Sequence, residues 1–357
     1  MVAFAPDYRS TNAYQSLLYR SIGPDFVPVA ISDVLELKEL KVPHAKAAVL
    51  HIHWTAPIIA PATDSTGAFT RLNKFLDQLD RAKERGVRIM WTIHNVMPHE
   101  SRFPDLERVL RQELADKADM VHILCDRTLE EIGDQFLVPE SKIRLVRHGS
   151  YVGVYPDLVA PEVARERLGY TADDTVILFL GGIRPYKGVD LLLDAFEKAV
   201  ARAPSLRLLV AGRPASFADM RELERRATSH PLIAANLNEI ADVDLQHFFK
   251  ASDVVALPYR TILNSGSAQL AFSFARPVIA PRLACLSDVE SEGVGLSFNP
   301  GDIEGLADCL VKSTVLKDRK FQQAARRIAE AYTGTDMSRD FAAILRELQV
   351  SGSDLGS

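Results

Sequence analysis

The sequence predicts an α/β protein made of two doubly wound domains that face each other across a cleft. Short apolar runs alternate with amphipathic, helix-like segments along most of the 357 residues, which is typical of parallel strands buried on both faces. The alternation lapses once, between Gly149 and Arg165, and then restarts. A chain of this length is also too long for one ordinary domain and suits two.

In the first half, apolar runs and helix-like segments follow one another in regular order. We expect strands at Val2–Ala5, Ala47–Ile52, Val87–Ile93, Met120–Leu124 and Ile143–Arg147. Residues at helical spacing predict helices at Ala13–Ile22, Ala68–Arg85 and Asp105–Lys117.

The second half repeats the same pattern. We expect strands at Thr175–Leu180, Leu206–Ala211, Ile233–Asn236, Val254–Leu257 and Val278–Ala280. The expected helices are Leu191–Arg202, Met220–Ser229, Asp244–Ala251, Ala268–Phe274 and Arg339–Leu348.

These elements divide the chain into two Rossmann-like domains and a C-terminal extension. The prediction assigns 1–160 to an N-terminal domain and 161–335 to a C-terminal domain. A helix within 336–350 is expected to pack back toward the first domain. The polar tail, 351–357, is expected to be disordered.

Composition narrows the class of protein. With 47% hydrophobic and 25% charged residues and a net charge of −5, the chain is predicted to be globular and to bind no nucleic acid. Its three cysteines, Cys125, Cys285 and Cys309, are too widely spaced to predict a disulfide framework or a zinc site. No apolar run approaches the length of a membrane span. We therefore expect a cytoplasmic protein.

One predicted helix raises the alternative of peripheral contact with the inner face of a membrane. Its apolar positions include Leu72, Phe75 and Leu79, and five cations lie along the same segment: Arg71, Lys74, Arg81, Lys83 and Arg85. Such a helix can lie on anionic lipid. It can equally be a domain helix with a solvated charged face, which is the more ordinary interpretation.

A glycine-rich loop follows the strand at Thr175–Leu180. In GGIRPYKGVDLL, Gly181 and Gly182 allow close backbone approach, and Arg184 and Lys187 stand where the next helix begins. A cation opposes the dipole at a helix N-terminus unless an anion binds there. The loop therefore predicts a clamp for the diphosphate of a nucleotide, although an Arg and a Lys on a surface loop can also be simply solvated.

A second loop of small polar residues precedes the helix at Ala268–Phe274. It contains Asn264, Ser265, Gly266 and Ser267. One of these residues suffices as a helix cap. The others leave backbone N–H groups open, so the loop predicts contacts with the phosphate or ribose of a donor.

Histidines follow the strands of the first half. His94 stands at the end of the strand Val87–Ile93, His53 ends the preceding strand, and His148 follows the last one. Because imidazole titrates near neutrality, His94 is predicted to be the base for an attacking hydroxyl, with Glu100 and His148 as further candidates. His53 and Asn95 are predicted to bind the acceptor. A structural role for any of these histidines stays open.

A metal site among the first-half histidines is not expected. His51 and His53 are expected to point to opposite faces of their strand. Apart from Glu100, no cysteine or carboxylate in these loops has metal-ligand spacing. No bound cofactor is expected either.

Several segments occur in an order that resembles a known family. In the second half they are GGIRPYKGVDLLLDAF, DVDLQHFFKASDVVALPYR, SGSAQLAFSFARPVIAP and GVGLSFNPGDIEGLADCL, and in the first half THN with PHE, and RHG. They resemble GT-B glycosyltransferases of the group 1, family 4 type, which includes bacterial exopolysaccharide and lipid-sugar enzymes. The resemblance implies an acceptor in the first domain and a nucleotide-sugar in the second. It assigns Arg184 and Lys187 to the diphosphate.

The sequence departs from this family at two positions. The family often has two glutamates eight residues apart that touch the sugar and the ribose, and here those positions are Ile262 and Leu270. Related enzymes with similar histidine loops include exopolysaccharide mannosyltransferases. An inverting reaction is therefore plausible, and retention stays open.

The sequence as a whole predicts a metal-independent glycosyltransferase. It is expected to move a hexose from a nucleoside-diphosphate sugar, either GDP-mannose or a UDP-hexose, to a hydroxyl of a saccharide or lipid-linked acceptor. Two alternatives remain at this stage. One is a non-hydrolysing nucleotide-sugar epimerase, and the other is a two-lobed sugar-binding protein without catalysis.

Overall fold

The computed structural model describes residues 1–31, 33–35, 48–98 and 101–350, and its chain divides into two compact units. In unit 1 the described residues run to His148 and resume at Gly334, and unit 2 is Gly149–Thr333. The sequence set the first boundary at 160, whereas the contacts group 149–160 with the second unit. The predicted Glu100 and the tail 351–357 lie outside the described residues.

Unit 1 is built on a parallel sheet of six strands. Its strand order is β2-β1-β3-β4-β5-β6. The strands are β1 (Val2–Ala5), β2 (Pro28–Ala30), β3 (Val49–Ile52), β4 (Arg88–Ile93), β5 (Met120–Ile123) and β6 (Ile143–Leu145). The sequence did not predict β2, because this short edge strand begins at Pro28, and a proline within an apolar run argues against a strand.

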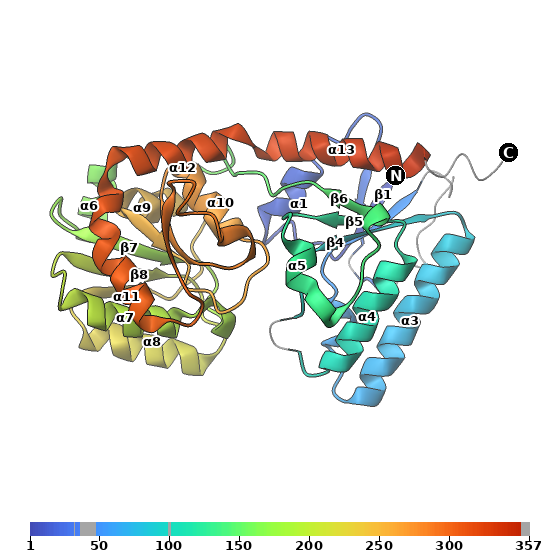
Figure 1. Ribbon diagram of the computed structural model, residues 1–357, viewed down its shortest axis with the longest axis horizontal. Coiled ribbons are helices and arrows are strands. Elements are labelled where there is room, and N and C mark those ends of the chain that lie inside the picture. Colours follow the sequence, from blue (N-terminus) through green and yellow to red (C-terminus); the bar gives the residue numbers. More distant parts are fainter. Residues whose placement is uncertain (32, 36–47, 99–100, 351–357) are drawn as a thin grey trace. The chain divides into compact units, whose positions relative to one another are not determined.

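The helices of unit 1 connect successive strands. They are α1 (Ala13–Leu18), α2 (Ala56–Ile59), α3 (Ser65–Glu84), α4 (Pro104–Lys117) and α5 (Thr128–Ile132). Figure 1 shows α3 and α4 side by side. The apolar face of α3 is occupied within the unit, since Leu72, Phe75 and Leu79 are at most 1% exposed. Apart from Phe69, which is 54% exposed, the surface that α3 offers to lipid is therefore mainly its charged side.

The last helix, α13 (Gly334–Val350), belongs to unit 1 and packs against α1. The hydroxyl of Ser338 donates to the carbonyl of Leu18 at 2.8 Å and accepts from the backbone N–H of Ser21 at 2.7 Å. The ring of Phe341 stacks on His51 with centroids 5.2 Å apart. The C-terminal segment of the chain thus completes the core of its N-terminal unit. Among the helices that the structure describes, none is long and apolar enough to cross a membrane.

Unit 2 has a second parallel sheet, in the order β12-β11-β10-β7-β8-β9. The strands are β7 (Thr175–Leu180), β8 (Leu206–Ala211), β9 (Ile233–Asn236), β10 (Val254–Ala256), β11 (Val278–Pro281) and β12 (Gly295–Phe298). Its helices are α6 (Pro161–Leu168), α7 (Val189–Val200), α8 (Phe217–Ser229), α9 (Leu245–Ala251), α10 (Gly266–Ser273), α11 (Ile303–Lys312) and α12 (Arg319–Ala331).

Helices cover both faces of the unit 2 sheet, which is why its strands read as continuous apolar runs. Along β7, Ile177 and Phe179 join one buried cluster with residues of α7 and α11. Val176 and Leu178 join another cluster with residues of α9, α10 and α12. Successive side chains of a strand point to opposite faces. This arrangement is the predicted doubly wound architecture.

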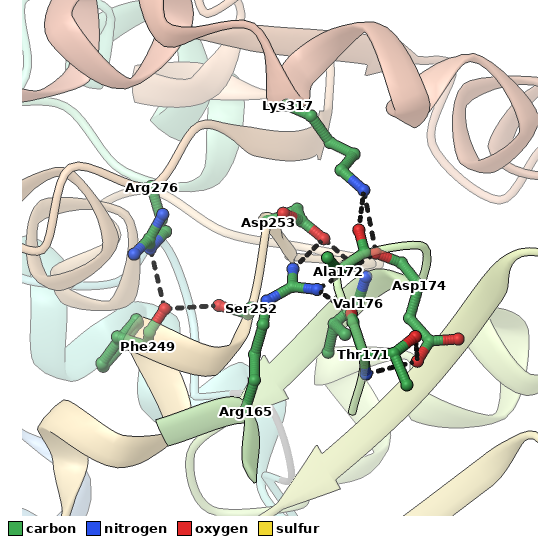
Figure 2. Close-up of polar contacts among 10 residues, drawn as sticks. All are labelled: Arg165, Thr171, Ala172, Asp174, Val176, Phe249, Ser252, Asp253, Arg276 and Lys317. Atoms are coloured by element: carbon green, nitrogen blue, oxygen red, sulfur yellow. Dashed lines mark hydrogen bonds and ion pairs between the residues drawn. The ribbon is translucent and has the colours of Figure 1, made fainter. Parts of the chain in front are cut away.

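A polar network holds the starts of β7 and β10 together, at the edge of the sheet where strands begin (Figure 2). The carboxylate of Asp253 accepts from Arg165 at 2.7 Å and from the backbone N–H of Val176 at 2.8 Å. Lys317 donates to the carbonyls of Ala172 and Asp174 at 3.1 and 3.0 Å. These bonds satisfy polar groups that the sheet would otherwise bury alone.

This network predicts a stability defect without a functional defect. Asp253→Ala removes the carboxylate partner of Arg165 and leaves the buried N–H of Val176 unsatisfied, so the free energy of unfolding should fall by ~3 kcal/mol. Urea denaturation measures this change. The matched control is Glu222→Ala, which removes an exposed partner of Arg225 and should leave the unfolding free energy unchanged. Equal stability of Asp253→Ala and the parent protein would contradict this account of the network.

Candidate active site

The predicted diphosphate loop connects β7 to α7 by a backbone path that only glycine follows readily. Gly181 has a φ of 140° and Gly188, which caps α7, has a φ of 67°. A Cβ on Gly188 would lie 2.0 Å from the carbonyl oxygen of Pro258. The loop after β7 is therefore pressed directly against the loop after β10.

Within this loop the side chain of Lys187 turns back toward the end of β7. A Cβ on Gly181 would lie 3.0 Å from its Nζ, and 4.0 Å from the hydroxyl of Ser267. Burial, together with the charge of Arg184, lowers the pKa of Lys187 to about 8. The charge of Lys187 is thus poorly solvated and lies near the exposed Arg184, which is an arrangement that an anion would stabilise.

The second predicted loop meets the first from the start of α10. Ser265 caps this helix by accepting from the N–H of Ala268 at 3.1 Å. The buried phenol of Tyr259 is hydrogen-bonded to Ser265 and Ser267. Asn264 and Gly266 are half-buried beside them, and Gly182 is exposed. The structure therefore brings Gly181, Lys187 and the residues around Gly266 to one edge of the sheet.

Arg260 joins the two loops and was not predicted from the sequence. Arg260 donates from its backbone to the carbonyl of Tyr186 at 2.8 Å, and from its guanidinium to Asp190 at 2.8 and 2.6 Å. A third guanidinium bond reaches the carbonyl of Pro185 at 3.1 Å. Neither Arg260 nor Asp190 stands out in the sequence, because each is an ordinary surface charge until the chain folds.

The two positions that depart from the family's glutamates have a structural role. Ile262 and Leu270 are partly buried and pack against the cluster that includes Phe272. Their side chains extend the apolar core beneath the loop and offer no hydrogen bond to a sugar or ribose.

In unit 1 the residues after β3 and β4 form an aromatic cluster around His94. The ring of His94 stacks on Trp54, with centroids 4.1 Å apart and planes at 13°, and lies edge-on to Tyr14 at 5.3 Å. His53 is 1% exposed, and its Nδ1 is 3.1 Å from Nε2 of His94. His53 therefore contacts His94 itself, from the side of the protein interior.

The structure also brings His148 to this cluster. Its ring lies 5.0 Å from that of Tyr14. Burial, with the neighbouring rings of His53, His122 and His148, holds the pKa of His94 well below its usual value of 6.5. His94 is thus a neutral imidazole at physiological pH, as a base must be.

A small, partly open hollow lies beside His94. It is lined by both indoles of the chain, by histidines and by Asn95, and its lining residues include His53, Trp54, Trp91, His94, Asn95 and Arg111. Aromatic walls with a few polar groups are typical of sites for small organic ligands. Asn95 and His94, both predicted from the sequence, thus line the same hollow.

One expectation about these histidines is wrong. His51 and His53 do not point to opposite faces, because residues two apart in a strand share a face. Their ring centroids are 4.0 Å apart. Even so, within 1–31, 33–35, 48–98 and 101–350, no group of three or more His, Cys, Asp or Glu residues is placed to hold a metal ion.

Comparisons with known proteins indicate the family to which this chain is similar. Residues 174–314 match the family model described as Glycosyl transferases group 1. A GDP-mannose:glycolipid 4-beta-D-mannosyltransferase of Xanthomonas campestris is 30% identical over 273 residues, which cover 76% of this chain and 70% of the relative. A D-inositol 3-phosphate glycosyltransferase of Corynebacterium efficiens is 26% identical over 250 residues, covering 66% of this chain and 58% of that protein.

Solved structures show the same fold. Anabaena HepE in complex with UDP and glucose has a TM-score of 0.67 at 15% identity, over 97% of this chain and 99% of that one. Sucrose-phosphate synthase from Thermosynechococcus elongatus has a TM-score of 0.69 at 17% identity, over 93% of this chain and 82% of that one. Likeness at this level of identity confirms the predicted fold class.

The geometry of the loop predicts that Lys187 binds a diphosphate through its charge. In Lys187→Ala, loss of one charge-assisted contact of ~1.5–3 kcal/mol should weaken nucleoside diphosphate binding about 10- to 100-fold. In the parent protein, affinity should fall as pH rises above 8, since the free lysine is then neutral and must take up a proton to bind. Calorimetric titration from pH 7 to 9.5 measures both effects.

Two further observations decide this prediction. The melting temperature of the empty Lys187→Ala protein should hold or rise, because the cation opposes the dipole of α7. Lys198→Ala, near the other end of α7, should bind as the parent does. Parent-like binding by both Lys187→Ala and Arg184→Ala would place the diphosphate elsewhere.

Proposed function

The chain belongs to the glycosyl transferases group 1 family and uses a nucleotide-sugar donor, and we propose from this that it transfers mannose from GDP-mannose to a hydroxyl of a glycolipid. The observation that carries the proposal is the 30% identity to a GDP-mannose:glycolipid mannosyltransferase across 76% of the chain. The epimerase and the two-lobed binding protein gain no support from the comparisons.

In the proposed reaction, unit 2 holds the donor. Arg184 and Lys187 neutralise the charge that develops on the departing diphosphate, and the backbone N–H groups around Gly266 bind its oxygens. Stabilising a leaving group in this way lowers the barrier to breaking the glycosidic bond. We propose that these two cations allow the reaction to proceed without a metal ion or other cofactor.

Unit 1 is proposed to hold the acceptor. His94 takes the proton of the attacking hydroxyl, and Asn95 and the indole of Trp54 bind the acceptor sugar in the hollow beside it. His148 adjusts the environment of His94, and the role of Glu100 stays a prediction. Direct displacement by the acceptor at the anomeric carbon inverts its configuration. The apolar Ile262 and Leu270 agree with a site that lacks the usual pair of glutamates.

The proposed place of action is the cytoplasmic surface of a membrane, where a glycolipid acceptor would be presented. Because Leu72, Phe75 and Leu79 of α3 are packed inside unit 1, contact with lipid would be mainly electrostatic, through exposed cations such as Lys74, Arg81 and Arg85. Such binding weakens with salt.

A panel of donors and nucleotides tests the substrate class. At about 100 times its dissociation constant, a bound nucleotide stabilises the folded protein by ~2.7 kcal/mol, which a thermal shift detects. We expect GDP and GDP-mannose to stabilise more than UDP and UDP-glucose. Mannose transfer to a glycolipid should proceed unchanged in EDTA and yield the β anomer by NMR. Stabilisation by uridine nucleotides alone would overturn the choice of donor, and an α product would overturn inversion.

The role of His94 is tested by substitution and by pH. His94→Ala should lose about 10²- to 10⁴-fold in turnover with little change in donor affinity, because a base acts on the acceptor. In the parent protein the acidic fall in rate should lie at lower pH than the ordinary histidine pKa of 6.5, because burial lowers the pKa of His94. This acidic limb should be absent in His94→Ala.

The control for this experiment is His230→Gln, in unit 2, which should keep the parent rate and acidic limb. Full activity of His94→Ala would contradict its role as the base and leave the assignment of the donor loops intact.

A further inference from the structure

A continuous chain of hydrogen bonds runs through the interior of unit 1 and ends at a backbone carbonyl. Apart from His94, each of its side chains is at most 6% exposed. The members, in order, are His94, His53, Tyr19, His51, Thr92, His122 and the carbonyl oxygen of Val146. These residues lie at the end of α1, on or directly after β3 and β4, on β5, and directly after β6. Only the folded unit therefore brings them together.

The carbonyl end of the chain determines the direction of the first bonds. Nε2 of His122 lies 2.9 Å from the oxygen of Val146. A carbonyl can only accept, so this nitrogen carries the proton. The imidazole is neutral, since burial lowers the pKa of His122 to about 4. Its Nδ1, 2.9 Å from the hydroxyl of Thr92, therefore accepts, and Thr92 donates.

The donor and the acceptor of each following bond are determined in the same way. With its proton given to His122, the hydroxyl of Thr92 accepts from Nε2 of His51 at 2.6 Å. His51 is neutral in its buried position, so its Nδ1 accepts from the hydroxyl of Tyr19 at 2.6 Å. The oxygen of Tyr19 then accepts from Nε2 of His53 at 2.7 Å.

The last bond reaches the proposed base. Nδ1 of His53 has no proton and accepts from Nε2 of His94 at 3.1 Å. His94 therefore carries its proton on Nε2, and its lone pair lies on Nδ1. Reversing every bond of the chain would require the carbonyl of Val146 to donate a hydrogen bond, and a carbonyl oxygen can only accept one.

We propose that this chain sets the tautomer of His94, so that Nδ1 is the nitrogen that takes the proton of the acceptor hydroxyl. The inference rests on the proposed function for its catalytic meaning. Tyr19, His51, Thr92 and His122 are positioning residues, because they act on the reaction only through His94. The hydrogen bonds that link Thr92, His122 and Val146 are as necessary as His53, the member of the chain that is bonded to His94.

The chain positions the proton and does not conduct it. When Nδ1 of His94 is protonated, Nε2 still donates to His53, and every later group already donates toward Val146. The terminal amide carbonyl is far too weak a base to receive a proton. The proton on His94 therefore returns to solvent or product from the Nδ1 side.

The test reads the tautomer directly by NMR of the full chain labelled with ¹⁵N-histidine at pH 7.5. Couplings from each ring nitrogen to the ring carbon protons distinguish Nε2–H from Nδ1–H, and single His→Gln variants assign the signals. We expect Nε2–H at His122, His51, His53 and His94. An Nδ1–H tautomer at His94 in the parent protein overturns the proposal without any variant.

A pair of substitutions at Thr92 breaks and restores the chain. In Thr92→Val, Nε2–H of His51 would face a methyl group, and a buried unpaired N–H is more costly than a buried lone pair. The segment from His51 to His94 should reverse, giving Nδ1–H at His94 and a fall in kcat of about 10²-fold, with KM for the donor unchanged. Thr92→Ser keeps the hydroxyl and should recover the Nε2–H tautomer and most of the rate.

Tyr19→Phe provides a second, independent break. It should also reverse His53 and His94, but His51 should stay Nε2–H because its bond to Thr92 survives. Backbone spectra establish that each variant is folded. Retention of Nε2–H at His94 in both folded variants overturns the proposal.

Turnover of His94→Ala separates failure of this proposal from failure of the proposed function. A parent-like rate in that variant refutes the base. The NMR result refutes or supports the chain by itself.

Discussion

A side chain on a parallel strand that is buried on both faces is stable in one of two ways. It is apolar and packs against its neighbours, or it is polar and all its polar groups are hydrogen-bonded. In unit 2, β7 is buried by apolar packing. Val176 and Leu178 face one layer of helices, and Ile177 and Phe179 face the other. The sheet of unit 1 carries His51, Thr92 and His122 on its central strands, and none of them is exposed. These polar groups are compatible with the interior because they bond to one another.

That requirement gives unit 1 a property that apolar packing cannot provide. A hydrophobic contact has no direction, whereas each hydrogen bond has a donor and an acceptor. Once the carbonyl of Val146 defines one end, the protons of the whole chain are ordered as far as His94. The C-terminal helix shares in this arrangement, since Phe341 stacks on His51 and covers it.

In unit 2 the constraint is electrostatic, because the charge of Lys187 in the loop after β7 is partly removed from solvent. Its loops converge at the carboxyl ends of the strands, where Gly188 lets the backbone pass against Pro258 and Arg260 joins both loops to Asp190. The network around Asp253 lies at the opposite edge of the same sheet (Figure 2). The stabilising network and the proposed anion site thus lie at opposite ends of the strands.

The sequence by itself determined the features that depend on local patterns. Apolar runs predicted ten of the strands at nearly their observed positions, because this signal lies within a few adjacent residues. The glycines and cations after β7 are a local signal of the same kind, and their binding of a donor stays a prediction. The strands β2 and β12 were not predicted, since β2 begins at Pro28 and β12 is a four-residue strand that begins with Gly295. His94 was predicted from its place after β4.

Only the tertiary structure decided which groups surround His94. His53 was expected to bind the acceptor and instead has both ring nitrogens bonded to Tyr19 and His94. Tyr19, Thr92 and His122 are far apart in sequence, and nothing local marks them as partners. A hydrogen bond requires two atoms within about 3 Å. Its existence across three strands is therefore a property of the fold and of no single stretch of chain.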